Sequence, residues 1–116
     1  MTVNEIEIPI LKKSYDLYKL FHEYRKTVSK QDRYTIWERS ENTLLDMLEC
    51  FLEAGYTKQT NKYVLLERGS VKLNLFRFFV RLMKDTGSID MKKYLLLQML
   101  VDEIGRMLGG WLRSQK

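Results

Sequence analysis

The sequence predicts an all-α protein, an antiparallel up-down-up-down four-helix bundle. Apolar residues recur at helical spacing in four segments, short polar connections join these segments, and the 116 residues include only one proline and six glycines. Amphipathic helices with short connections pack antiparallel around a shared core. A chain of this length buries about two-thirds of its unfolded surface, so we expect a single domain over residues 1–116.

The first helix is expected at about residues 9–28. Pro9 suits the first turn of a helix, where its missing N–H group costs no hydrogen bond. Apolar residues then recur with spacings of three and four, at Leu17, Leu20, Phe21, Tyr24 and Val28. Residues 1–8 precede this pattern and are expected to be loosely ordered.

The second helix is expected at about residues 34–54, after a connection at Ser29–Arg33. Gly55 is placed to end this helix in a left-handed conformation. Trp37 either extends the apolar face or anchors a partner, since tryptophan serves both roles. The apolar face comprises Leu44, Met47, Leu48, Phe51 and Leu52.

The third and fourth helices are expected at about residues 58–84 and 90–113. A turn with Gly87 at its centre joins them, and Ser88 or Asp90 is suited to cap the fourth helix. One face of the fourth helix carries Leu97, Leu100, Val101, Ile104, Leu108 and Trp111.

The fourth helix also contains Gly105 and Gly109, four residues apart on one face. A glycine inside a helix costs about 1 kcal/mol relative to alanine, so two of them require a cause. Either the helix continues and another backbone approaches closely, or it ends at Gly109 and Gly110 with Trp111 folding back. We assign Gly105, Gly109 and Trp111 to packing or to an interface between copies of the chain.

The third helix carries more apolar surface than one core requires. One side has Leu66, Leu73, Phe76, Val80 and Met83, and another has Val71, Leu75, Phe78, Phe79 and Leu82. A bundle helix needs an apolar stripe only about 100° wide. The second side therefore predicts a further buried surface, most simply a contact between copies. Leu75, Phe79 and Leu82 are its candidate residues.

Between these two sides lies a row of cations, Arg77, Arg81 and Lys84, which we call the basic stripe. Its members lie three or four residues apart, and together with Ser70 and Asn74 their side chains leave the helix within a sector of roughly 80°. Such a row suits the phosphates of a nucleic-acid backbone. Alternatively, Arg77 and Arg81 pair with the acids of the second helix, within the bundle or across a subunit interface.

Residues that carry chemistry are few. The single histidine, His22, and the single cysteine, Cys50, cannot build a Cys/His metal cluster, and no nucleophile–base pattern or phosphate-binding glycine loop is present. We expect no enzyme activity, no metal and no cofactor. A lone cysteine indicates a reducing compartment, and no apolar run is long enough to span a membrane, so we expect a cytoplasmic protein.

Two segments together resemble a known family. LNLFRFFVRLMK (residues 73–84) and VDEIGRMLGGWLRSQ (residues 101–115) resemble the accessory variability determinant (Avd) proteins of diversity-generating retroelements. A related branch, the four-helix proteins encoded in intervening sequences of bacterial 23S rRNA genes, usually carries an N-I-A-E-G-like segment in its second helix. LEAGY at residues 52–56 departs from that segment, which favours the Avd branch.

The resemblance implies a four-helix bundle that assembles into a homopentameric ring and has no catalytic site. It implies that the chain binds template RNA or cDNA through a basic surface. It also implies association with a reverse transcriptase in support of mutagenic reverse transcription. The alternative is a structural homo-oligomeric bundle of the 23S rRNA intervening-sequence type, acting as a protein or RNA interaction module.

Five cations are candidates for contact with nucleic acid. By resemblance, the family's arginines correspond to Arg77, Arg81 and Arg106; geometry and charge add Lys84 and Arg113. Arg106 alternatively forms local ion pairs, because Asp102 and Glu103 precede it by four and three residues.

Overall fold

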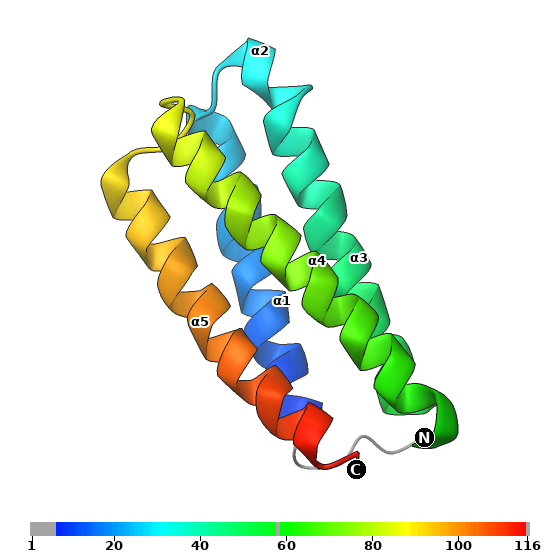
Figure 1. Cartoon of the computed structure of the whole chain (residues 1–116). Coiled ribbons are helices and arrows are strands. Elements are labelled where there is room, and N and C mark those ends of the chain that lie inside the picture. The colour runs from blue at the N-terminus through cyan, green and yellow to red at the C-terminus, as the bar shows by residue number, and fades with distance from the viewer. Residues whose placement is uncertain (1–6, 58, 116) are drawn as a thin grey trace.

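The computed structural model describes residues 7–57 and 59–115, and within this range every regular element is helical. Four long helices pack as a bundle, with two short helical segments between the first and second of them (Figure 1). The all-α prediction is confirmed. The elements are α1 (Glu7–Tyr24), η1 (Arg25–Thr27), α2 (Lys30–Arg33), α3 (Ile36–Tyr56), α4 (Gln59–Asp85) and α5 (Met91–Arg113).

The first helix ends earlier than predicted, at Tyr24 rather than Val28. Val28 is extended, with φ −82° and ψ 137°, although its side chain stays in the core. Arg33 explains the early end: its guanidinium donates hydrogen bonds to the carbonyl oxygens of Arg25 (3.2 Å), Lys26 (3.2 Å) and Val28 (2.9 Å). Carbonyls at the end of a helix need such partners, and a cation satisfies them well.

The connection at Ser29–Arg33 is also more ordered than predicted, because it contains α2. The Ser29 hydroxyl accepts a hydrogen bond from the Asp32 N–H and caps this short helix. Asp32 in turn accepts a hydrogen bond of 2.7 Å from the hydroxyl of Ser88. The α1–α3 connection and the α4–α5 turn are thereby joined at one end of the bundle.

The predicted role of Gly55 is wrong. α3 continues through Gly55 to Tyr56, and Gly87 is the only glycine with positive φ among the described residues. Gly87, at φ 83°, occupies the turn predicted for it. Asp90 caps α5 by accepting a hydrogen bond of 2.9 Å from the Lys93 N–H, as one of the two predicted caps.

Residue 58, predicted to start the third helix, lies outside the described residues. So do residues 1–6 of the segment expected to be loosely ordered, whereas Glu7 and Ile8 belong to α1. None of the described helices combines the length and apolar character needed to cross a membrane.

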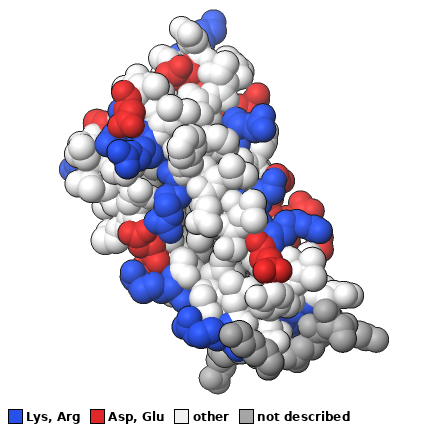
Figure 2. Space-filling view, viewed as in Figure 1, with Lys and Arg blue, Asp and Glu red and all other residues white. Residues whose placement is uncertain are grey.

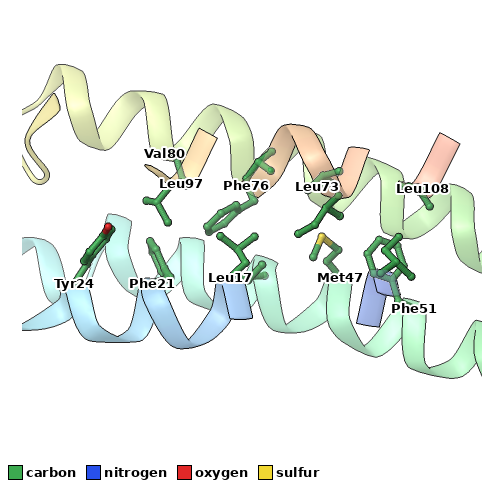
Figure 3. Packing of buried hydrophobic residues seen from close by; sticks show 14 of the residues in the cluster. Leu17, Phe21, Tyr24, Met47, Phe51, Leu73, Phe76, Val80, Leu97 and Leu108 are labelled. Atoms are coloured by element: carbon green, nitrogen blue, oxygen red, sulfur yellow. The ribbon is translucent and has the colours of Figure 1, made fainter. Parts of the chain in front are cut away.

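The core lies between all four long helices and is rich in aromatic rings (Figure 3). Trp37 is 2% exposed, so its place in the core is confirmed. Its ring stacks on Phe21 with 5.0 Å between centroids, and Phe21 meets Phe76 edge to face at 5.1 Å. The core side of the third helix is confirmed too: Leu66, Leu73, Phe76, Val80 and Met83 are all buried.

Gly69 makes a close contact between α3 and α4. A Cβ atom added to Gly69 would lie 2.6 Å from Cε1 of Phe51, too close for any real contact. Phe51 itself is fully buried and packs against Trp111, with 6.4 Å between ring centroids. Absence of a side chain at Gly69 therefore lets α4 lie directly on the ring of Phe51.

Candidate nucleic-acid interface

The basic stripe lies on the side of α4 that faces α5. Arg77 forms a salt bridge with Asp102 of α5. Arg81 and Lys84 both approach the carboxylate of Asp85, at 3.7 Å and 3.1 Å. The side chain of Arg81 is 67% exposed, compared with 35% for Arg77 and 22% for Lys84. Arg81, the middle member of the stripe, is therefore open to solvent, whereas Arg77 and Lys84 on either side of it are partly buried.

Lys84 has a second partner across the groove between the helices. Its Nζ atom lies 4.7 Å from the ring centroid of Tyr94 on α5, a cation–π distance. The hydroxyl of Tyr94 accepts a hydrogen bond of 3.0 Å from Gln98. The Tyr94 ring is therefore held in place beside the stripe.

Acids of α3 are not the partners found for Arg77 and Arg81. Asp46 pairs with Lys72 at 3.4 Å, on the other side of α4. Glu41 accepts a hydrogen bond of 2.9 Å from Tyr18; burial and this carboxylate raise the pKa of the Tyr18 hydroxyl. Within the chain, the alternative that α3 neutralises the stripe is wrong, and α5 and the end of α4 supply the acids instead.

Arg106 is more available than its neighbours in sequence suggest. Asp102 pairs with Arg77, and Glu103 pairs with Lys13 of α1 at 3.2 Å. Arg106 is exposed, and in the part of the chain that the structure describes it makes no salt bridge. The alternative of local ion pairs for Arg106 is therefore not found among the described residues, because Asp102 and Glu103 have partners on other helices. Arg113, the last residue of α5, is also exposed.

Two adjoining hollows line the groove between α4 and α5. The larger, about 480 Å³, is bordered by Arg77, Asp102, Gly105 and Arg106, with leucines at its base. The smaller, about 290 Å³, is bordered by Arg77, Arg81 and the rings of Phe78 and Tyr94. Both hollows include Arg77 and Asn74, so they form one continuous groove. In Figure 2, blue atoms with red among them follow both sides of α4.

Within the described part of the single chain, Gly105 and Gly109 of α5 do not contact another backbone closely. The helix continues past them to Arg113, and Trp111 is fully buried in the core, so the helix does not end at Gly109. A Cβ atom on Gly105 would meet the guanidinium of Arg77 at 3.5 Å, and one on Gly109 would meet that of Arg113 at 3.4 Å. Within the chain, both glycines border open space and side chains rather than another backbone.

The second apolar side of α4 faces away from the core. Leu75 and Leu82 are each 39% exposed, Phe78 is 65% exposed, and Phe79 is half-buried. Together with Val64 and Val71 they form a band along α4, which we call the apolar band. Figure 2 shows uncharged atoms between the blue rows where α4 runs. These side chains remain partly or largely exposed, so the single chain has the predicted surplus of apolar area.

The sequence pattern did not reveal that Asp102, Tyr94 and Phe78 line the groove between α4 and α5. The sequence indicates Asp102 only as a partner of Arg106, because spacing within a helix says nothing about the neighbouring helix. Phe78 was grouped with the apolar residues, although its helical position borders the basic stripe. That position, next to Arg77 and three residues before Arg81, was a usable signal.

The described residues offer no group of three histidine, cysteine or acidic side chains suited to a metal ion. Burial raises the pKa of the Cys50 thiol, which opposes formation of the nucleophilic thiolate. His22 is exposed, with Nδ1 3.9 Å from Glu41. The residues considered for chemistry therefore lie apart, on α1 and α3, and are not assembled into a site.

None of the curated proteins compared with this chain matches it. A family model described as bAvd-like matches residues 8–115, nearly the whole chain and all four long helices. Both segments that carry the resemblance to Avd proteins lie inside the matched range. The chain, a helical bundle with a cationic groove between its last two helices, belongs to the bAvd-like family.

Proposed function

We propose that this chain is a non-catalytic accessory protein of a diversity-generating retroelement. It binds template RNA or cDNA through the groove between α4 and α5 and associates with the reverse transcriptase during mutagenic reverse transcription. It acts in the cytoplasm as an up-down-up-down bundle assembled into a homo-oligomer, a pentameric ring by family resemblance. The observation that carries the proposal is the basic stripe, extended by Arg106 across the groove, in a bAvd-like chain.

Phosphates bind this groove by replacing carboxylates. Asp102 and Asp85 are about half exposed and hold their cations at the protein surface, where such pairs contribute only about 0–1 kcal/mol. A polyanion releases condensed counterions as it binds, and this gain outweighs the loss of the weak pairs. Several cations along one groove then hold consecutive phosphates of the same strand.

The double change Arg77→Ala, Arg81→Ala tests the proposal. We expect weaker binding of a fluorescent oligonucleotide, and a slope of log affinity against log salt that is smaller by about 1 to 2, because two phosphate contacts are lost. Asp102→Asn should act in the opposite direction by releasing Arg77. Fluorescence anisotropy over a salt series measures all three proteins.

A matched control removes the same charge elsewhere. Lys19→Ala with Arg39→Ala takes two exposed cations from α1 and α3, outside the groove. This variant should keep most of the affinity and nearly the parental salt slope. If both double variants lose binding equally, net charge rather than the groove is responsible, and the proposal fails.

The alternative is a homo-oligomeric interaction module of the 23S rRNA intervening-sequence type, favoured by the exposed apolar band. In that case the arginines act at protein interfaces. Light scattering on the Arg77→Ala, Arg81→Ala variant separates the two functions. Loss of the assembly supports the interaction module, whereas an intact assembly with weakened oligonucleotide binding supports the accessory protein.

A further inference from the structure

The groove between α4 and α5 carries an aromatic ring as well as cations. Phe78 is 65% exposed, the most exposed of the large apolar side chains on α4. It borders the smaller hollow together with Arg77 and Arg81. Its ring meets Phe79 at 63° with 6.4 Å between centroids, so the half-buried Phe79 supports it from one side. A supported ring between two arginines is a platform on which a base stacks while its phosphates meet the cations.

The larger hollow offers room for a second base. Its volume of about 480 Å³ falls within the range of small-molecule pockets, and Leu73, Leu108 and Leu112 give it an apolar lining. Asn74 at its border supplies an amide that both donates and accepts hydrogen bonds. Gly105 keeps the hollow open, because a side chain on its Cβ would project beside Arg77.

From these features we infer that the groove selects single-stranded nucleic acid, with Phe78 stacking on an unpaired base. The inference rests on the proposed function and names the form of nucleic acid that is bound. In a duplex the faces of the bases are already stacked, so a duplex offers only its phosphates to the basic stripe. A single strand offers phosphates to the arginines and base faces to Phe78 at the same time.

Burial of Phe78 by a second protein fits the geometry less well. Phe78 lies at the edge of the apolar band next to Arg77 and Arg81, with which it shares a hollow. A protein surface that covered Phe78 would also remove these two cations from water, at a cost that an apolar contact does not offset. Leu75 and Leu82 lie farther from the stripe around the helix, so a protein contact there leaves Phe78 open.

Substitution of Phe78 tests the inference. Phe78→Leu keeps an apolar side chain but removes the ring, and should weaken binding of oligo(dT) and oligo(U) about tenfold. Binding of a duplex of equal length should change little. Phe78→Trp should retain or increase single-strand affinity. Because Trp37 and Trp111 are buried, the new exposed indole should report base stacking through quenching of its fluorescence.

Filling the larger hollow provides a second variant. Gly105→Leu should lower single-strand affinity and leave duplex affinity near the parental value. Gly110→Leu, which adds the same side chain to α5 outside that hollow, is its control. Circular dichroism and light scattering must show parental helicity and assembly size for each variant.

The outcomes separate the inference from the proposed function. Equal affinity of the parent for single strand and duplex, or parental binding by Phe78→Leu, overturns the inference. The proposed function still stands in that case if Arg77→Ala, Arg81→Ala weakens binding. A change of assembly size in Phe78→Leu assigns the ring to a protein interface and also overturns the inference. Absence of binding to any oligonucleotide overturns both.

Discussion

At the scale of single residues, Gly69 and Gly105 show that glycines of similar appearance in a sequence have opposite roles. Both lie inside long helices. A Cβ atom on Gly69 would lie 2.6 Å from the buried ring of Phe51, whereas one on Gly105 would make only ordinary contact with Arg77 at 3.5 Å. Gly69 is therefore required by packing between α3 and α4. Gly105 is not required by the fold of the single chain.

Alanine at these two positions should change stability in opposite directions. Gly69→Ala forces Phe51 to move in a tight core, and we expect a loss of about 1–2 kcal/mol after the gain in helix propensity is subtracted. Gly105→Ala should stabilise the protein by about 0.4–1 kcal/mol. Urea unfolding followed by circular dichroism measures both. Stabilisation by Gly69→Ala would show that the Phe51 ring yields easily.

Individual residues were predictable from the sequence only where their own helix determined their role. Trp37 and Trp111 follow the apolar face of their helices, and both are buried. Arg106 could not be assigned, because its two neighbouring acids were taken up by Arg77 and Lys13 on other helices. Competition between helices for one carboxylate depends on packing distances that a periodic pattern does not contain.

At the scale of elements, helix ends depend on a few polar groups. Arg33 ends the first helical segment by taking three carbonyl oxygens, and Asp90 starts α5 by accepting the Lys93 N–H. The second device was predictable, because an acid before an apolar helix is a common cap. The first was not, since Arg33 acts on residues five to eight positions earlier in the chain, through a turn whose path the sequence did not reveal.

Asp90 should make stability depend on acid pH. The hydrogen bond from the Lys93 N–H, followed by smaller contributions from the charges of Lys93 and Lys92, lowers the pKa of the Asp90 carboxyl below 3.8. When folding lowers the pKa of a carboxyl, that carboxyl stabilises the folded state at pH values above its pKa in the unfolded chain. That contribution to stability disappears as the pH falls through the pKa of the carboxyl in the folded state.

Asp90→Asn isolates this effect, because asparagine also caps helices but does not titrate in this range. The variant should lose less stability than the parent between neutral pH and pH below 3.8. Thermal unfolding at a series of pH values, followed by circular dichroism, measures the difference. Parallel pH profiles for the two proteins would mean that other carboxylates account for the acid dependence.

At the scale of the whole molecule, two surfaces of α4 point in different directions. One carries the basic stripe toward α5, and the other carries the apolar band into solvent. The sequence predicted both surfaces, because a helix of known period assigns each residue to a side. It did not predict the groove, whose walls come from two helices and whose shape depends on missing side chains at Gly105 and Gly109.

Self-association should depend on the apolar band. Leu75→Glu with Leu82→Glu places two charges on side chains that are now 39% exposed, so the folded chain itself should tolerate them. We expect the assembly to dissociate, with light scattering giving the mass of the single chain. Lys12→Glu with Lys19→Glu, which adds two glutamates on exposed positions of α1, is the control. A parental mass for the Leu75→Glu, Leu82→Glu protein would remove the band as the interface.

The salt bridge between Arg77 and Asp102 also affects which anions the groove binds in a cell. Asp102 is tethered beside the guanidinium, so its effective concentration is far above that of any free phosphate or mononucleotide. A small anion that meets one cation at a time gains too little to displace it. A polymer that engages Arg77, Arg81 and Arg106 together gains from every contact at once. We therefore expect Asp102 to make the groove selective for nucleic-acid polymers over free phosphate and mononucleotides, although all of these carry phosphate groups.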